Sequence, residues 1–318
     1  MSSRPGGQGV ASLQMTASMV ILGAVGLVIK WIPYSSTAIA AFRGIIGVAS
    51  LLLIARIMGH RIGWEQLRRN RRLLIFSGAA LGINWICSFA AYKFADVSLV
   101  TICLYTYPVF LLLAAPFLFR ERITCSALLC TAACVAGMFL TSGALTKPIS
   151  AQTGMGIALS LIAAVFAAAV ILCVKLLDGV DSLDITIVQL AAATTLLLPY
   201  GLLTGAFQGM RPDVKSVLLL LAAGILQTGV AYYLQFAAVK RLKNQLTAIL
   251  SYVDPLVAVL LSMLVLGESM DGLQLLGAAL ILCSTLVNQL FAHRSDAPPP
   301  DGGNTGSPAP TGAANSQL

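Results

Sequence analysis

The residue whose position suggests chemistry most directly is Asp254, an acidic side chain in the middle of the long apolar run at residues 245–266. A bare carboxylate at the centre of a membrane-spanning helix costs about 2.5–3.5 kcal/mol on insertion scales, so it is expected to face the interior of a helix bundle or a wet cavity. Thr247 and Ser251 lie on the same helical face as Asp254. The adjacent Pro255 would leave backbone carbonyls of the preceding turn free to bind cargo. We interpret Asp254 as a site for cargo or a proton, and a structural carboxylate that caps or pairs with a neighbouring helix is the alternative.

A second ionisable residue, Arg43, lies inside the apolar run at residues 35–58. Three roles are open for it, namely snorkelling of the long side chain to the outer interface, a structural ion pair, and direct binding of an anionic cargo.

Polar and aromatic side chains recur at matching depths of the other apolar runs. In chain order they are Asn84, Trp85, Tyr105, Tyr107, Gln227, Tyr232 and Tyr252. An aromatic wall beside a carboxylate suits a cationic or amphipathic cargo, because the face of an aromatic ring attracts positive charge. The alternatives are tyrosine packing with satisfied hydroxyls and hydrogen bonds between neighbouring helices. These residues, with Arg43, Ser251 and Asp254, form the predicted substrate site.

Motifs for other chemistries are absent from the sequence. There is no GxxxxGK[ST] loop to hold nucleotide phosphates, and no GxSxG or HExxH motif. The two histidines, His60 and His293, lie among arginines in polar flanks, and the seven cysteines form no CxxC pair and are read as free thiols. The sequence therefore predicts no enzyme, no metal and no cofactor, and any transport must draw its energy from a gradient.

The composition belongs to a membrane protein with several spans. Of the 318 residues, 58% are apolar and 10% are charged, and the mean hydropathy is +0.88. A soluble domain carries roughly a quarter charged residues. The net charge of +8 is best explained by basic loops that set topology, so no nucleic-acid partner is expected.

The apolar runs are separated by short polar breaks. Ten transmembrane helices are expected, at residues 13–31, 35–58, 73–95, 97–119, 124–142, 152–175, 183–205, 215–239, 245–266 and 271–292. The segment 1–12 is expected to be a cytoplasmic flank, and the Pro- and Gly-rich residues 293–318 a disordered cytoplasmic tail. Fourteen lysines and arginines fall on the side of the amino terminus and five on the other, which predicts that both termini are cytoplasmic.

An internal repeat divides the chain into halves at 13–145 and 151–292. Residues 73–141 align without a gap on residues 220–288 at a shift of 147, so that Tyr105 meets Tyr252 and Pro108 meets Pro255. Because five helices per half is an odd number, the second half is expected to be inverted in the membrane. Inverted repeats are typical of secondary transporters that bind cargo near the midplane and work by alternating access.

Three segments carry a resemblance to a known family. They are AFRGIIG around Arg43, LYTYPVFLLLAAPFLFRE at Leu104–Glu121, and SYVDPLVAVLLSMLVLGE at Ser251–Glu268. The sequence resembles the drug/metabolite transporter superfamily, EamA type, over about residues 13–292. That resemblance implies a ten-helix transporter, whose relatives export amino acids, metabolites, metallophores or drugs, or take up vitamins, nucleotide-like compounds or choline.

The sequence thus predicts an all-α polytopic membrane protein made of two inverted five-helix EamA repeats. We expect a secondary transporter that exports a small organic metabolite, such as an amino acid, metallophore or drug-like compound, across the inner membrane. Uptake of a vitamin or cationic metabolite is the alternative, and a non-transporting membrane protein is a third candidate. The expected partners are the small-molecule substrate and the lipid bilayer, with a proton as candidate coupling ion and a homodimer left open.

Overall fold

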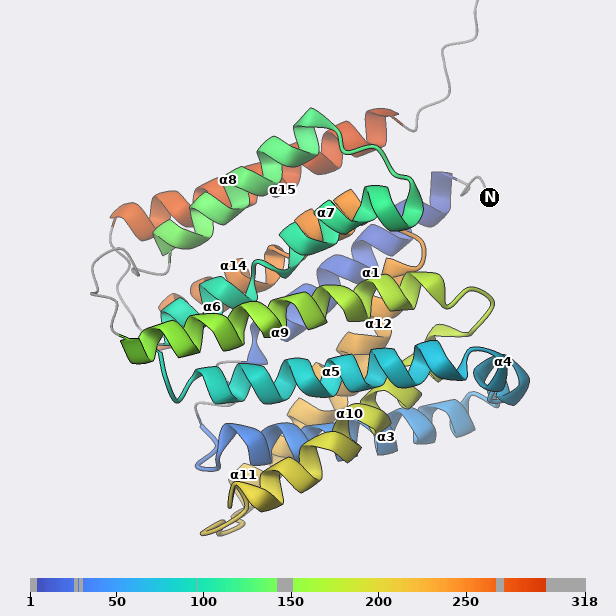
Figure 1. The fold of residues 1–318 in the computed structure, drawn as a ribbon, viewed down its shortest axis with the longest axis vertical. Coiled ribbons are helices and arrows are strands. Elements are labelled where there is room, and N and C mark those ends of the chain that lie inside the picture. The colour runs from blue at the N-terminus through green and yellow to red at the C-terminus, as the bar shows by residue number, and fades with distance from the viewer. Residues whose placement is uncertain are drawn as a thin grey trace, which may run out of the picture.

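The computed structural model describes residues 5–25, 28, 31–95, 97–141, 151–266 and 272–295, and this part of the chain contains helices and no strand (Figure 1). The helices of the first half are α1 (Pro5–Gly23), α3 (Ser36–Ile57), α4 (Trp64–Arg69), α5 (Arg71–Ala91), α6 (Val97–Leu104), α7 (Tyr107–Phe119) and α8 (Cys125–Thr141). Those of the second half are α9 (Ala151–Leu176), α10 (Ser182–Leu203), α11 (Val214–Ala222), the π-helix η2 (Ala223–Val230), α12 (Ala231–Val239), α13 (Asn244–Leu250), α14 (Val253–Leu266) and α15 (Gly272–Ser295).

Every predicted helical range overlaps one of these helices or two or three consecutive ones. Six helical segments of the described chain are long and apolar enough to cross a membrane. The all-α polytopic class is therefore confirmed, while ten complete crossings remain a prediction. One boundary differs clearly, because α1 begins at Pro5, inside the segment expected to be a polar flank. Ala11 and Met15 in this early part are fully buried, so packing extends the helix. Of the tail predicted to be disordered at 293–318, residues 293–295 belong to α15, where the helix continues past the predicted end, and 296–318 lie outside the described residues.

The second half runs in the opposite direction to the first. In Figure 1, α1 and α9 have opposite directions, and α15 ends at the end of the bundle where α1 begins. The halves also interlock. Helices α1 and α3 pack on α12 and η2, which belong to the second half, while α9 and α10 pack on α5 of the first half. The antiparallel pair α8 and α15 lies at one edge. Each half therefore supplies the central helix on which the other half packs.

Polarity is distributed inside out, as a lipid surround requires. Large apolar side chains such as Phe117 and Leu203 are more than four-fifths exposed, at 87% and 88%. In contrast, Gln189, Thr228 and Thr247 are fully buried. Lipid offers apolar contacts and no hydrogen bonds, so polar groups are satisfied inside the bundle. The described chain therefore has the surface of a multi-pass membrane protein.

Close helix crossings hold α3 against α10 and η2. A Cβ added to Gly44 would lie 2.1 Å from Thr194 Oγ1 of α10, and one added to Gly224 would lie 2.5 Å from Ile46 Cβ of α3. Only glycine permits backbones to approach this closely, as at other membrane helix interfaces. Both crossings lie within one turn of Arg43 along α3, so α10 and η2 are its neighbouring helices.

Two helices are interrupted at corresponding places. The fourth pass breaks at Tyr105 and Thr106, between α6 and α7, and the ninth breaks at Ser251 and Tyr252, between α13 and α14. A proline follows within four residues of each break, and its ring clashes with the carbonyl four residues earlier while it lacks an N–H to continue the ladder. Pro108 and Pro255 are 147 residues apart, so the two breaks are the same device repeated.

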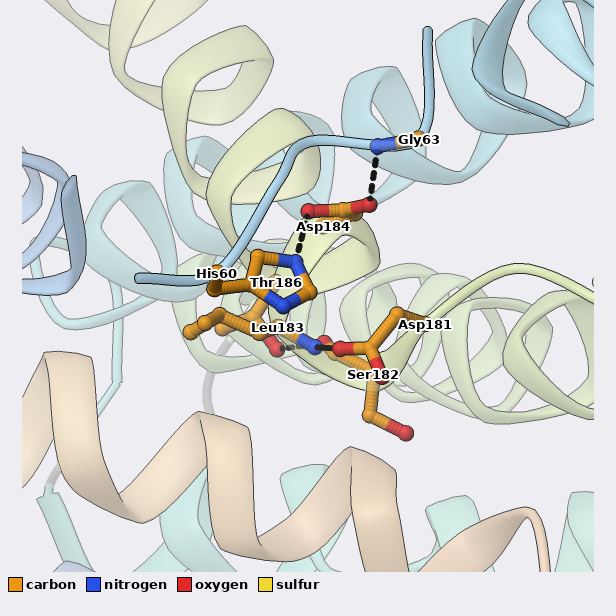
Figure 2. A network of polar contacts seen from close by, with 7 residues as sticks. All are labelled: His60, Gly63, Asp181, Ser182, Leu183, Asp184 and Thr186. Carbon is orange, nitrogen blue, oxygen red and sulfur yellow. Dashed lines mark hydrogen bonds and ion pairs between the residues drawn. The ribbon is translucent and has the colours of Figure 1, made fainter. Parts of the chain in front are cut away.

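A polar network anchors one end of the bundle (Figure 2). The buried carboxylate of Asp184, near the start of α10, accepts a hydrogen bond from the Gly63 backbone N–H at 2.9 Å, and its other oxygen lies 2.9 Å from Nε2 of His60. Asp181 caps α10 by accepting from the Leu183 N–H at 2.8 Å. The connection between α3 and α4 is thereby fixed to the start of α10.

Candidate functional site

The two broken helices meet face to face. Asp254 lies in the first turn of α14, and its carboxyl group faces the hydroxyl of Tyr105 at the other break. Tyr107, at the first position of α7, faces the hydroxyl of Ser251. The rings of Tyr105 and Tyr107 lie 6.5 Å apart between centroids. Each break therefore contributes side chains that contact the other.

Asp254 forms no ion pair with any residue of the described chain. Its position in the first turn of a half-helix is favourable for a negative charge, because the unpaired N–H groups of a helix start carry partial positive charge. Tyr105 supplies a hydroxyl group beside it. The carboxyl group can thus accept a proton or the cationic group of a solute without displacing a protein cation.

Arg43 is the cationic counterpart, 9% exposed and directed toward the π-helix η2. Its Nε donates to Thr228 Oγ1 at 3.0 Å, and one terminal nitrogen donates to the Gln227 carbonyl at 3.5 Å. No carboxylate of the described residues pairs with it. Since a guanidinium carries five N–H donors, several remain for a further acceptor.

The π-helix gives this region an irregular wall. Its widened turn appears in the hydrogen bond from Thr228 Oγ1 to the carbonyl of Ala223, five residues earlier, at 3.2 Å. Within the described part of the chain, the buried Gln227 Oε1 has no hydrogen-bond partner. The aligned segment of the first half, residues 76–83, is ordinary α-helix within α5. Single π turns are frequent at functional sites, and here one turns polar groups toward Arg43.

An aromatic pair marks the symmetry axis. Trp85 Nε1 donates to the hydroxyl of Tyr232 at 3.2 Å, and the two rings stand edge to face at 6.1 Å between centroids. These residues are 147 positions apart, so each is the other's equivalent. Two equivalent positions can touch only close to the axis that relates them. One buried cluster holds two further equivalent pairs, Tyr105 with Tyr252 and Cys134 with Ile281.

Tyr232 lies near both charged groups, Arg43 and Asp254. Tyr107 lies near Tyr232 and Asp254. The predicted cation, carboxylate and aromatic side chains therefore share one region around the axis.

Two predicted site residues have different surroundings. Asn84 donates its amide to the Ala163 carbonyl of α9 at 2.7 Å. Tyr252 is fully buried in a cluster that faces α8 and α15, and its hydroxyl has no hydrogen-bond partner among the residues that the structure describes. Their roles in substrate binding remain predictions. In this structure Asn84 is hydrogen-bonded to α9, and Tyr252 packs within the buried cluster.

Sequence reasoning missed two polar pairs. Gln189, which aligns with Arg43 at a shift of 146, donates to Ser77 Oγ at 2.8 Å, and its buried Oε1 has no hydrogen-bond partner among the described residues. Asp184 was not singled out, although an acidic residue near the start of a long apolar run was the available signal. His60 was regarded as an isolated histidine among arginines, and its partner comes from a distant helix.

Comparisons with known proteins agree with this architecture. The model of the EamA-like transporter family matches twice, at residues 10–143 and 154–289. The chain is 25% identical over 272 residues to the uncharacterized transporter YxxF of Bacillus subtilis, covering 85% of this chain and 86% of that protein. It is 27% identical over 199 residues to an uncharacterized transporter of Archaeoglobus fulgidus, covering 62% of this chain and 69% of that protein.

A solved structure described only as the crystal structure of a protein superposes with a TM-score of 0.80. It is 20% identical in sequence, and the match covers 90% of this chain and 99% of that one. At this identity the likeness shows the fold.

Proposed function

Because the chain belongs to the EamA-like transporter family, with both halves matched, we propose that it is a secondary transporter for a small organic solute that carries an anionic and a cationic group. An amino acid is the simplest such solute, and metallophores and drug-like amphoteric compounds share the pattern. Transport proceeds by alternating access of the inverted halves. The observation that carries the proposal is a buried cation and a carboxylate, neither of which has an ionic partner among the described residues, with Tyr232 near both.

The energetics favour an occupant with both charges. A charged group buried without its partner is expensive, so a site with two such groups is poised for the complementary charges of a ligand. The anionic group of the solute would bind the free donors of Arg43. Its cationic group would bind Asp254, with the rings of Tyr105, Tyr107 and Tyr232 supplying cation–π contacts.

Direction and energy source complete the proposal. We infer export across the inner membrane with both termini in the cytoplasm, and a proton as coupling ion that competes with the solute for Asp254. Uptake of a vitamin or a cationic metabolite is the second candidate, and it is favoured specifically by the aromatic side chains beside the carboxylate. The basic loop between α3 and α5 supports the orientation, because positively charged loops stay in the cytoplasm.

The test uses purified protein in proteoliposomes and three related labelled solutes. These are zwitterionic amino acids, their amides, which lack the carboxylate, and their N-acetyl derivatives, which lack the cation. We expect flux of a zwitterionic solute, accelerated by a proton gradient, and at least about tenfold weaker competition by each blocked form, the equivalent of losing one charge-assisted hydrogen bond. If either blocked form competed as well as the zwitterionic solute, the two-charge site would be contradicted. Vesicles of known orientation decide between export and uptake.

A further inference from the structure

One end of the bundle is closed by a lysine at the end of α12. Lys240 Nζ donates to the carbonyl of Leu177 at 2.9 Å and also to that of Val180. Both carbonyls belong to the connection between α9 and α10, just past the last turn of α9, where helix carbonyls lack internal partners. The ammonium group of Lys240 thus joins the end of α12 to the connection between α9 and α10.

Further contacts close the same end. Lys175 Nζ donates to the Leu242 carbonyl at 2.5 Å and lies 5.7 Å from the ring centroid of Phe119. The carboxylate of Glu121 accepts from the backbone N–H and the side-chain amide of Asn244, at 3.1 and 3.0 Å. The α12–α13 connection is therefore held by groups from α9 and from the connection after α7.

The opposite end is open at the corresponding place. Lys93, the equivalent of Lys240 at the shift of 147, is exposed, and its ammonium has no partner among the described residues. It lines a cavity of about 430 Å³ together with Tyr34 and the connection at Thr204–Met210. The helix caps Ser35 and Asp181 align α3 with α10 at a shift of 146, and at that shift Tyr34 corresponds to Val180. The cavity is therefore lined by Lys93 and by Tyr34. Tyr34 corresponds to Val180, whose carbonyl accepts a hydrogen bond from Lys240.

We propose that Lys240 and Lys93 are alternating gate latches: Lys240 holds one end closed in this structure, and Lys93 closes the other end by donating to carbonyls of the α1–α3 connection after Lys240 releases. The inference rests on the proposed transport cycle, in which inverted halves exchange their conformations. Backbone carbonyls are suitable acceptors for a reversible latch, because they bind an ammonium without the strength of a buried carboxylate.

The two latches are not equally strong. Burial lowers the pKa of Lys240 from its ordinary value, and the carboxylates of Asp178 and Asp181 raise it in part. The corresponding positions at the other end are Ile32 and Ser35, which carry no charge. The two carboxylates thus offset part of the burial cost of the Lys240 ammonium, and neither corresponding position beside Lys93 offers such a charge. We therefore expect the protein without solute to rest with Lys240 bound, as in this structure.

The test measures amide hydrogen exchange of the full-length protein in lipid nanodiscs, without solute. Lys240→Gln should speed exchange of residues 177–183 by about tenfold or more, the equilibrium equivalent of losing a hydrogen bond to a charged group. Lys240→Arg, which keeps the charge and donors, should retain most of the protection. Lys215→Gln, at an exposed lysine of α11, is the matched control and should change nothing. Unchanged protection of 177–183 in Lys240→Gln would overturn the latch.

Lys93 is tested in the opposite state. A transported solute should slow exchange at residues 31–37 of the parent as that end closes, and Lys93→Gln should abolish this slowing and reduce the maximal rate about tenfold with little change in KM. Equal slowing in Lys93→Gln and Lys215→Gln would refute the alternation. If the parent transports no solute, the proposed function fails, while the exchange at 177–183 still decides whether Lys240 is a latch.

Discussion

The broken helices of the two halves share a backbone design but differ in charge. In both, a proline interrupts the helix at aligned positions, with Pro108 in one and Pro255 in the other. The residue before the proline is Tyr107 in the first half and Asp254 in the second. The prolines determine where each helix is interrupted. The residue just before the proline, Tyr107 or Asp254, determines whether the interruption carries a charge.

Helices α3 and α10, which are equivalent in the two halves, also differ in charge, but here the first half holds the charged residue. Arg43 in α3 contacts the π-helix of the second half, whereas its counterpart Gln189 in α10 contacts Ser77 of the first half through an uncharged hydrogen bond. One half therefore supplies the cation and the other the carboxylate. If the proposed function holds, a solute with two unlike charges has one preferred orientation between these two groups.

The largest effect is expected when the carboxylate is removed. Asp254→Asn keeps size and polarity but loses the titratable charge, so coupled flux should fall at least about a hundredfold and lose its dependence on the proton gradient. The variant should still insert, and Asp254→Leu should insert no worse, because leucine is favoured in hydrocarbon. Asp184→Asn removes another buried carboxylate, away from the site, and should leave gradient dependence intact. Flux against pH at matched expression is the measurement, and an unchanged profile in Asp254→Asn would assign coupling elsewhere.

Making the first half resemble the second should have the next largest effect. Arg43→Gln installs the residue found at the aligned position and should raise KM for an anionic or zwitterionic solute about tenfold to a hundredfold, as expected for losing hydrogen bonds to a charged group. Gln189→Ala is the matched change in the other half and should cost about 1 kcal/mol of stability through its bond to Ser77, with little effect on KM. Similar KM values for Arg43→Gln and the parent would show that Arg43 does not contact cargo.

The sequence revealed the scaffold more completely than the site. Apolar runs and the repeat predicted the helical ranges and the inversion, because these follow from residue type and spacing. The repeat also aligned Pro108 with Pro255, but the ranges 97–119 and 245–266 were expected to be continuous helices and each is interrupted. The π-helix was not predictable, since its widened turn depends on how η2 packs against α3 at Gly224 and Arg43. The contact between Trp85 and Tyr232 was also hidden, because the repeat aligned them without indicating that the axis passes between them.

A smaller effect is expected at that axis. Trp85→Phe and Tyr232→Phe each remove one partner of the same hydrogen bond, so each should cost about 1 kcal/mol of stability. The double variant should cost less than the sum, because the bond can be lost only once. Thermal unfolding in detergent provides the comparison, with full additivity excluding a direct bond between the two side chains.

The smallest effect, with an unusual sign, is expected for the second aligned tyrosine pair. Tyr105 faces Asp254, whereas the hydroxyl of its equivalent Tyr252 is buried and forms no hydrogen bond with any described residue. An unpaired buried hydroxyl costs its desolvation, so Tyr252→Phe should leave the thermal midpoint unchanged or raise it, by up to about 1 kcal/mol in stability. Tyr105→Phe removes a group that contacts the carboxylate and should lower flux several-fold with little change in stability. Comparing the two variants thus distinguishes a tyrosine that contacts the charged site from one that only packs beside it. A loss of about 1 kcal/mol in Tyr252→Phe would mean that this hydroxyl is hydrogen-bonded during the cycle and belongs with Tyr105 in the site.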